Sequence, residues 1–215
     1  MNKFAYIFDL DGTLGDTLPL CIFSFQEALE KLSGKRPSQE EVMGYFGYTE
    51  EGITKSMYPQ NWQHYYDTYL EIYTQNHDIC PEPFEGIIGI LEYLKESGHK
   101  MALVTGKGQP SAEITLTKFK IKHYFEYIET GSPIKSIKPE CIKKIIQKWD
   151  IDPEKIYYVG DSHTDIIDSK TAGVNPIAVS WASTANYQKL VEQNPHLIFT
   201  KIEDFKNWIE SAEIH

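Results

Sequence analysis

The pattern that most constrains the fold of this chain is a regular alternation of short apolar runs and amphipathic segments, which begins near residue 82. Each run has the length of a buried strand, and each amphipathic segment carries apolar residues at helical spacing. Such an alternation predicts parallel strands joined by right-handed helical crossovers, with helices on both faces of the sheet. The strands predicted here are residues 100–106, 124–131, 155–161 and 176–181. The sequence therefore predicts an α/β fold built on a parallel sheet.

A long helical insert separates the first predicted strand from this alternating region. The apolar run at residues 4–10 predicts that first strand. The segment that follows has helical periodicity, and two prolines near residue 82 end it. We therefore predict a Rossmann-like core made of residues 1–15 and 82–215, and a small all-α unit made of residues 16–81.

Inside the insert, three local signals predict where helices begin, end and pack. Gly34 closes a stretch whose apolar residues recur at three- and four-residue steps. Ser38 precedes Glu41 at the spacing of a capping box. Aromatic side chains then recur at helical intervals, and we expect them to pack in a core: Trp62, Tyr65, Tyr66, Tyr69 and Tyr73.

Charge and cysteine usage restrict the classes of partner and compartment. The chain has 31 acidic and 21 Lys and Arg residues, which gives a formal net charge of −10. This balance disfavours nonspecific binding to nucleic acid or to anionic membranes. No apolar run is long enough to span a bilayer, and the first residues do not resemble a signal peptide. Cys21, Cys80 and Cys141 lie far apart, which favours reduced thiols in or near the core of a cytoplasmic protein.

Chemically active residues follow the predicted strands at the edge of the sheet where parallel strands end. Ligands bind at that edge in open parallel sheets. The candidate residues are Asp9, Asp11, Thr105, Gly106, Lys138, Asp161 and Asp165. Lys138 stands immediately before Pro139, where we expect the chain not yet to be helical. We expect Pro139 to start the next helix.

Four carboxylates at one edge of a sheet need a cation, because they cannot all stay ionised side by side without one. A hard divalent ion with oxygen ligands meets this need. Mg²⁺ suits a site that has few protein ligands and room for water and a phosphate oxygen. The sequence therefore predicts a Mg²⁺ site, with Lys138 adding a second positive charge.

The acidic pair at the end of the first strand allows two roles to be separated. Asp9 would attack phosphorus as a carboxylate and become an aspartyl-phosphate. Asp11 would protonate the leaving oxygen and then remove a proton from the hydrolytic water. Thr105, Gly106 and Lys138 would hold the phosphoryl oxygens.

Four segments in this order resemble the motifs of the haloacid dehalogenase superfamily of phosphohydrolases. The segments are "DLDGT" from Asp9, "VTGK" from Val104, "IKPE" around Lys138, and "VGDSHTD" through Asp161. The resemblance covers nearly the whole chain, and it implies that the helical insert is the small helical cap of that superfamily. The branch it resembles contains phosphoglycolate phosphatases, some pyrophosphatases and a sugar-phosphate mutase.

The resemblance also implies roles for individual residues. Asp9, Asp161 and the backbone carbonyl of Asp11 match family metal ligands, and Asp165 supports the metal from close by. Two positions depart from the commonest pattern of the branch, since Gly15 replaces a usual Val and Gly106 a frequent Asn. These departures weaken an assignment to any one substrate.

The predicted function is a Mg²⁺-dependent phosphatase for a small phosphorylated metabolite, either phosphoglycolate-like or a sugar phosphate. A phosphomutase of the β-phosphoglucomutase type or a pyrophosphatase would use the same residues. A phosphonate hydrolase would need a Schiff-base lysine in the cap, and a phosphoacceptor signalling domain would be shorter. The residues considered for substrate contact are Tyr48, Thr49, Lys55 and Lys107, whereas His163 is interpreted as a solvent-facing residue at a helix start. The oligomeric state, monomer or dimer, is left open.

Overall fold

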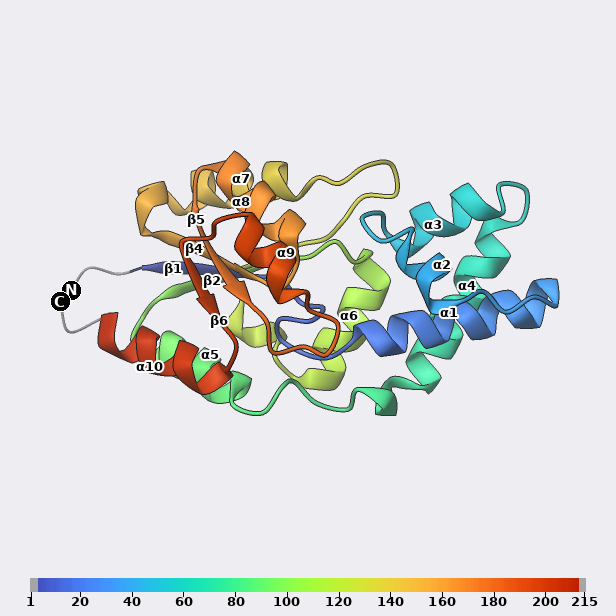
Figure 1. Cartoon of the computed structure of the whole chain (residues 1–215), viewed down its shortest axis with the longest axis horizontal. Helices are drawn as coiled ribbons and strands as arrows, with labels where there is room; N and C mark the ends of the chain where they lie inside the picture. Colours follow the sequence, from blue (N-terminus) through green and yellow to red (C-terminus); the bar gives the residue numbers. More distant parts are fainter. Residues whose placement is uncertain (1–3, 213–215) are drawn as a thin grey trace.

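A six-stranded parallel sheet forms the centre of the larger part of the molecule (Figure 1). The computed structural model describes residues 4–212. The strand order is β3-β2-β1-β4-β5-β6, and every pairing is parallel. The strands are β1 Ala5–Phe8, β2 Lys100–Val104, β3 Tyr127–Glu129, β4 Ile156–Gly160, β5 Asn175–Val179 and β6 Leu197–Phe199. In the register, Phe8 lies opposite Leu103 and Val159, so the carboxyl ends of the three central strands meet at one edge.

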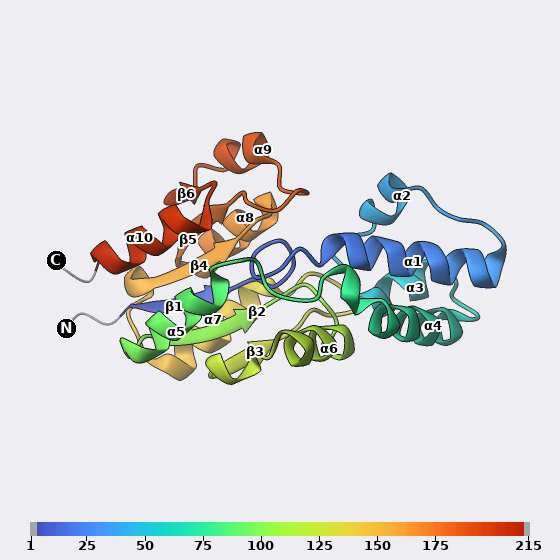
Figure 2. The same cartoon turned by 90° about the horizontal axis from the view of Figure 1, so that it is seen from below.

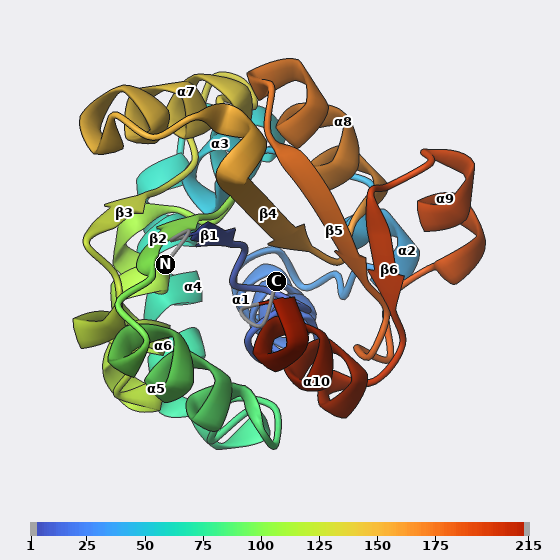
Figure 3. The same cartoon turned by 90° about the vertical axis from the view of Figure 1, so that its left-hand side faces the viewer.

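Helices cover both faces of the sheet, which confirms the predicted Rossmann-like architecture (Figure 3). One face packs against α5 Ile87–Glu96, α6 Gln109–Phe119 and α10 Ile202–Ala212. The other face packs against α7 Lys138–Trp149 and α8 His163–Ala172. Side chains of β1 alternate between these two cores, because successive residues of a strand point to opposite faces. The remaining short helices are α9 Tyr187–Glu192, η1 His77–Ile79, η2 Lys122–Tyr124 and η3 Pro153–Lys155.

Residues 16–81, the helical insert, form a separate group of helices beyond the sheet (Figures 1 and 2). These are α1 Leu18–Ser33, α2 Gln39–Met43, α3 Glu50–Met57 and α4 Trp62–Gln75. They enclose a core of their own, in which α1 and α4 supply most of the buried side chains. The boundaries of the insert stay a prediction.

The local signals in the insert act as expected. Gly34 closes α1 in the left-handed conformation, with φ of 73°. Ser38 and Glu41 form the capping box of α2, each side chain bonding the backbone N–H of the other. The four predicted core tyrosines of α4 are buried, whereas Trp62 is half-buried beneath the Lys55 ammonium.

Several element assignments were incomplete or wrong. The first strand is shorter than residues 4–10, and α3, α9 and β6 were not predicted. The expectation that Lys138 precedes the helix is wrong, because α7 begins at Lys138 itself. Pro139 then occupies the first turn, where its missing N–H leaves no intrahelical bond unmade.

The three cysteines are free and buried, as expected. Among the helices of the described residues, none is sufficiently long and apolar to cross a bilayer.

Candidate active site

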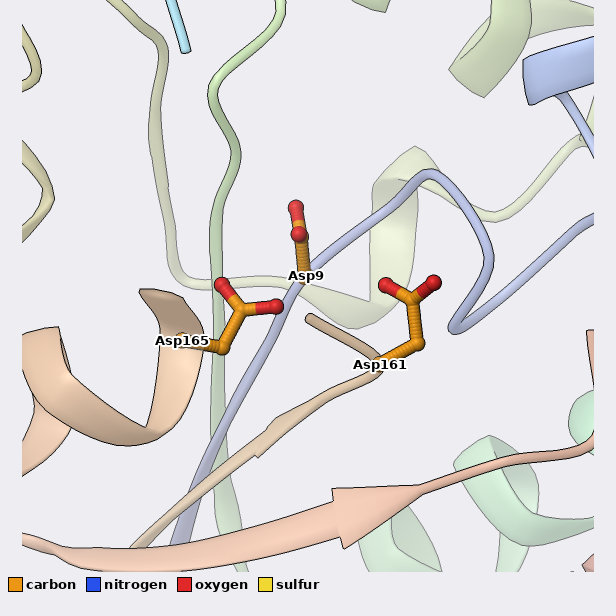
Figure 4. Close-up of side chains that lie close together, drawn as sticks. All are labelled: Asp9, Asp161 and Asp165. Atoms are coloured by element: carbon orange, nitrogen blue, oxygen red, sulfur yellow. The ribbon is translucent and has the colours of Figure 1, made fainter. Parts of the chain in front are cut away.

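Three buried carboxylates meet at the carboxyl edge of the sheet (Figure 4). Asp9 follows β1, Asp161 follows β4, and Asp165 lies in the first turn of α8. One oxygen of each lies within 4.8 Å of one oxygen of each of the others. Their exposed fractions are 6%, 7% and 1%. The structure thus brings together predicted residues that lie more than 150 positions apart in the chain.

The turn after β1 lets the Asp161 carboxylate approach the backbone. Gly12 has φ of +73°, a conformation that side chains other than glycine rarely adopt. A β-carbon at this position would overlap the carboxylate of Asp161. The Gly12 N–H donates to the Gly15 carbonyl at 2.9 Å, which closes the turn. Glycine is therefore required here by both backbone conformation and space.

Lys138 joins two of the three carboxylates. Its Nζ lies 2.7 Å from Asp9 Oδ2 and 2.5 Å from Asp165 Oδ1. Burial alone would lower the pKa of Lys138, but Asp165 and Asp9 raise it well above its ordinary value. Asp165 also accepts hydrogen bonds from the N–H and hydroxyl of Ser162 at 3.0 and 2.7 Å. Asp165 therefore fixes both the start of α8 and the position of the Lys138 ammonium.

One ammonium does not neutralise three buried carboxylates. Burial raises the pKa of Asp9 from 3.8 to about 7, against the lowering effect of Lys138. Burial and the neighbouring Asp165 and Asp9 raise the pKa of Asp161 well above its ordinary value. A group of converging carboxylate oxygens with excess negative charge is the donor set that Mg²⁺ prefers. The residues present therefore fit the predicted ion.

Asp11 does not join this carboxylate cluster with its side chain. Its Oδ1 accepts a short hydrogen bond from the Thr17 hydroxyl at the start of the insert. The same oxygen lies 3.3 Å from Lys107 Nζ. Asp11 lines the same cavity as Asp9, so the two acids have different neighbours within one site.

Lys107 is a buried cation at the boundary between the core and the insert. Its Nζ lies 3.5 Å from Glu50 Oε1, donates to Cys21 Sγ at 2.9 Å and lies over the Tyr73 ring at 4.7 Å. Its side chain is 1% exposed. Burial opposes its charge, but Asp11 and the other nearby groups raise the pKa of Lys107 well above its ordinary value.

Glu50 fastens the insert to the core through the start of α6. Its carboxylate accepts from the Gly108 N–H at 2.8 Å and from the Ser111 hydroxyl at 2.6 Å. Gly108 is the N-cap of α6 and has no side chain to bond the free N–H groups of the first turn. Sequence reasoning missed Glu50, because nothing in the sequence pairs it with residues nearly 60 positions away.

A cavity of about 620 Å³ lies between the carboxyl edge of the sheet and the insert. It is lined by Asp9, Asp11, Gly106, Lys107, Lys138 and Asp161, together with Tyr48 of the insert. His163 also lines it, at the start of α8, and is exposed.

Three other candidates lie outside the lining of this cavity. Thr105 is buried behind it, and its hydroxyl accepts from the Lys107 N–H at 3.2 Å. Thr49 is the buried N-cap of α3. Lys55 pairs with Glu51 one turn earlier on α3, at 2.5 Å.

The structure explains one of the two departures from the motif pattern. A β-carbon on Gly15 would lie 2.5 Å from the ring of Phe119 on α6. Phe119 therefore occupies the space that a side chain at position 15 would need. Gly106 has no close neighbour of this kind among the described residues, where Lys138 Cε is the one atom within 4 Å of its missing β-carbon, at 3.8 Å.

Comparisons with known proteins agree with this geometry. The family model of haloacid dehalogenase-like hydrolases matches residues 6–179. Pyrophosphatase PpaX of Bacillus mycoides is 28% identical over 92% of this chain and 93% of its own length. PpaX of Bacillus thuringiensis is 30% identical over 81% of this chain and 82% of its own. The crystal structure of a predicted phosphoglycolate phosphatase from Haemophilus somnus has a TM-score of 0.82 at 24% identity, over 97% of this chain and 99% of its own.

Proposed function

Because the chain belongs to the haloacid dehalogenase-like hydrolases and is a phosphatase-like enzyme of that family, we propose that it hydrolyses small phosphate esters through Asp9, with Mg²⁺ as its cofactor. The observation that carries this proposal is the contact of Lys138 with Asp9 beside Asp161 and Asp165. A nucleophilic carboxylate, a fixed ammonium and a set of metal-binding oxygens are the parts that phosphoryl transfer needs.

Each of the candidate site residues has a distinct part in the proposed reaction. Asp9 attacks phosphorus, and the bond to the leaving oxygen breaks as an aspartyl-phosphate forms. Asp11 gives a proton to that oxygen, so the alcohol leaves neutral, and then takes a proton from the water that attacks the phosphoryl group. Lys138 and the Gly106 backbone hold the phosphoryl oxygens.

Asp9, the backbone carbonyl of Asp11 and Asp161 are the proposed Mg²⁺ ligands, and Asp165 supports them. Mg²⁺ supplies charge compensation that lets Asp9 act as a carboxylate near neutral pH. The sequence predicts that Thr105 holds a phosphoryl oxygen; because Thr105 does not line the cavity, we propose instead that it holds the loop that carries Gly106 and Lys107. The helical insert is the proposed cap, which limits the size of the leaving group.

Two related reactions remain alternatives within the same site. Hydrolysis of pyrophosphate is favoured by the names of the PpaX relatives. A mutase would pass the phosphoryl group from Asp9 to a sugar instead of water. The signalling-domain alternative is disfavoured by family membership, and the phosphonate alternative is disfavoured by the position of Lys55 outside the cavity. A cytoplasmic location and a monomeric or dimeric state stay predictions.

A panel of phosphate esters and pyrophosphate, assayed with and without Mg²⁺, tests the proposal. We expect Mg²⁺-dependent release of phosphate that Asp9→Asn abolishes. Asp204→Asn, an exposed carboxylate on α10, is the matched control and should retain activity. Equal release by wild type and Asp9→Asn would refute the proposed nucleophile. Following the isomerisation of β-glucose 1-phosphate in the same assay separates a mutase from a phosphatase.

A further inference from the structure

The helical insert, residues 16–81, forms one wall of the cavity, and the structure describes all of these residues. None of the insert residues that line the cavity is a lysine or an arginine. We call this surface the insert wall. It consists of Leu18, Cys21, Phe25, Met43, Phe46, Gly47, Tyr48, Glu50 and Ile53. Apolar residues therefore dominate the surface that faces the phosphate-binding edge of the sheet.

The insert wall exposes large apolar side chains to the cavity. Tyr48 is 52% exposed and Met43 is 39% exposed, and Phe46 between them is half-buried. A ligand that covers apolar surface of this kind removes it from water, which stabilises the complex. Concave sites that combine apolar walls with a few polar groups are typical of small-molecule binding.

The basic residues of the insert lie elsewhere. Arg36 pairs with Glu27 and Glu30, and Lys55 pairs with Glu51. Lys31 and Lys35 also lie outside the cavity lining. None of these four side chains lines the cavity.

Two of the cations that line the cavity, Lys138 and Lys107, are already engaged by carboxylates, whereas the third, Lys189, is exposed. Lys138 contacts Asp9 and Asp165, and Lys107 contacts Asp11 and Glu50. Glu50 is the one charged residue of the insert wall among the described residues, and it is negative. An anionic leaving group placed against this wall would be desolvated without a partner, which is costly.

From this wall we infer that the enzyme acts on phosphomonoesters whose leaving group is uncharged and presents an apolar face to Met43, Phe46 and Tyr48. The inference rests on the proposed phosphatase function and narrows its substrate class. The value of kcat/KM should be higher for esters with neutral leaving groups than for esters whose leaving group carries a carboxylate. It should also be low for pyrophosphate, whose leaving group is inorganic phosphate.

A pair of substrates that differ only in a remote charge tests the inference. Benzyl phosphate and 4-carboxybenzyl phosphate have benzylic alcohol leaving groups of similar reactivity, and only the second carries a carboxylate. We expect kcat/KM of the full chain with Mg²⁺ to be about tenfold or more higher for benzyl phosphate, a ratio equal to about 1.4 kcal/mol. The value of kcat/KM for pyrophosphate should be low, like that for 4-carboxybenzyl phosphate.

Adding a cation to the insert wall should reverse the preference. Tyr48→Arg should raise kcat/KM for 4-carboxybenzyl phosphate by about tenfold relative to benzyl phosphate, since it supplies the missing partner. Tyr45→Arg is the matched control, because Tyr45 is exposed in the same segment but does not line the cavity. It should leave the ratio unchanged.

Lys189 of α9 is the residue that could bind an anionic leaving group from the other side of the cavity. It is exposed and lines the cavity on the core side. A wild-type preference for the charged substrate or for pyrophosphate, lost in Lys189→Gln, would overturn the inference and make Lys189 the anion contact. An equal or higher kcat/KM for the charged substrate without that dependence would also overturn it. Failure of the proposed function is a different result, because no substrate would then give Asp9-dependent phosphate release.

Discussion

Replacing Lys107 by methionine should destabilise the protein strongly, because it leaves two carboxylates facing each other at the base of the insert. Lys107 Nζ lies 3.3 Å from Asp11 and 3.5 Å from Glu50. At these distances each attraction amounts to about 5 kcal/mol at an effective dielectric constant of about 20, before desolvation is subtracted. Breaking a buried pair by removing one partner typically costs about 3 to 5 kcal/mol. We expect a loss of that size in the free energy of unfolding.

A double-mutant cycle isolates the contact between Lys107 and Glu50. Glu50→Gln keeps an oxygen that can accept from Gly108 or Ser111 but removes the charge that faces Lys107. Lys107→Met should therefore cost about 1 to 3 kcal/mol less in the Glu50→Gln background than in the wild type. Urea denaturation monitored by circular dichroism, with metal chelated, gives each free energy from its midpoint and slope.

The pair formed by Lys118 and Asp78 is the matched control. It also joins α6 to the region beyond α4, at 2.6 Å, but its side chains are 41% and 85% exposed. Solvent screens such a pair, so its cycle should show no resolvable coupling. If the losses of unfolding free energy caused by Lys107→Met and Glu50→Gln were additive, as expected for the exposed pair, the buried contact would not hold the insert on the core.

Three further predictions concern other parts of the chain. Gly15→Val should cost about 1 to 3 kcal/mol by overpacking against Phe119, and the cost in urea denaturation should shrink in a Phe119→Leu background. Because its pKa is raised from 3.8 to about 7, Asp9 favours the metal-free fold at low pH, and this contribution is lost as pH rises through about 7. The rise in melting temperature on adding Mg²⁺ should therefore be larger at about pH 8 than at about pH 5, and Asp9→Asn should reduce that difference, leaving the part that Asp161 contributes. Ser38→Ala should cost about 1 kcal/mol by removing the capping box of α2, whereas Ser38→Asp should retain most of the stability.

The sequence predicted the parts of the fold that depend on local patterns. Strong periodicity located α1 and α4, and apolar runs located the first five strands because these strands are bounded by glycine, proline and polar residues. β6 was missed because its apolar run has only three residues, whereas the equally short edge strand β3 lies within the longer aromatic-rich run 124–131. α3 was not predicted, because glycines at positions 47 and 52 are typical of a loop, whereas Thr49 caps this helix by accepting from the Gly52 N–H.

The candidate site was predictable where a motif placed a residue at the end of a strand. Asp9 and Asp161 meet because parallel strands bring their carboxyl ends to one edge, and Lys138, at the start of α7, contacts Asp9 there. The contacts of Lys107, Glu50 and Ser111 were not predictable, since they depend on how the insert packs on α6. Packing of one group of helices on another leaves no local signal in a single sequence.

Rapid-quench mass spectrometry of the enzyme during turnover tests the central claim most directly. With Mg²⁺ and a hydrolysed ester, we predict that one phosphoryl group appears on the peptide that contains Asp9, decays as phosphate is released, and is sensitive to hydroxylamine as an acyl phosphate should be. The account would be contradicted if the phosphoryl group appeared on a different residue. It would also be contradicted if the enzyme released phosphate, in single-turnover and multiple-turnover experiments, while Asp9 was never modified.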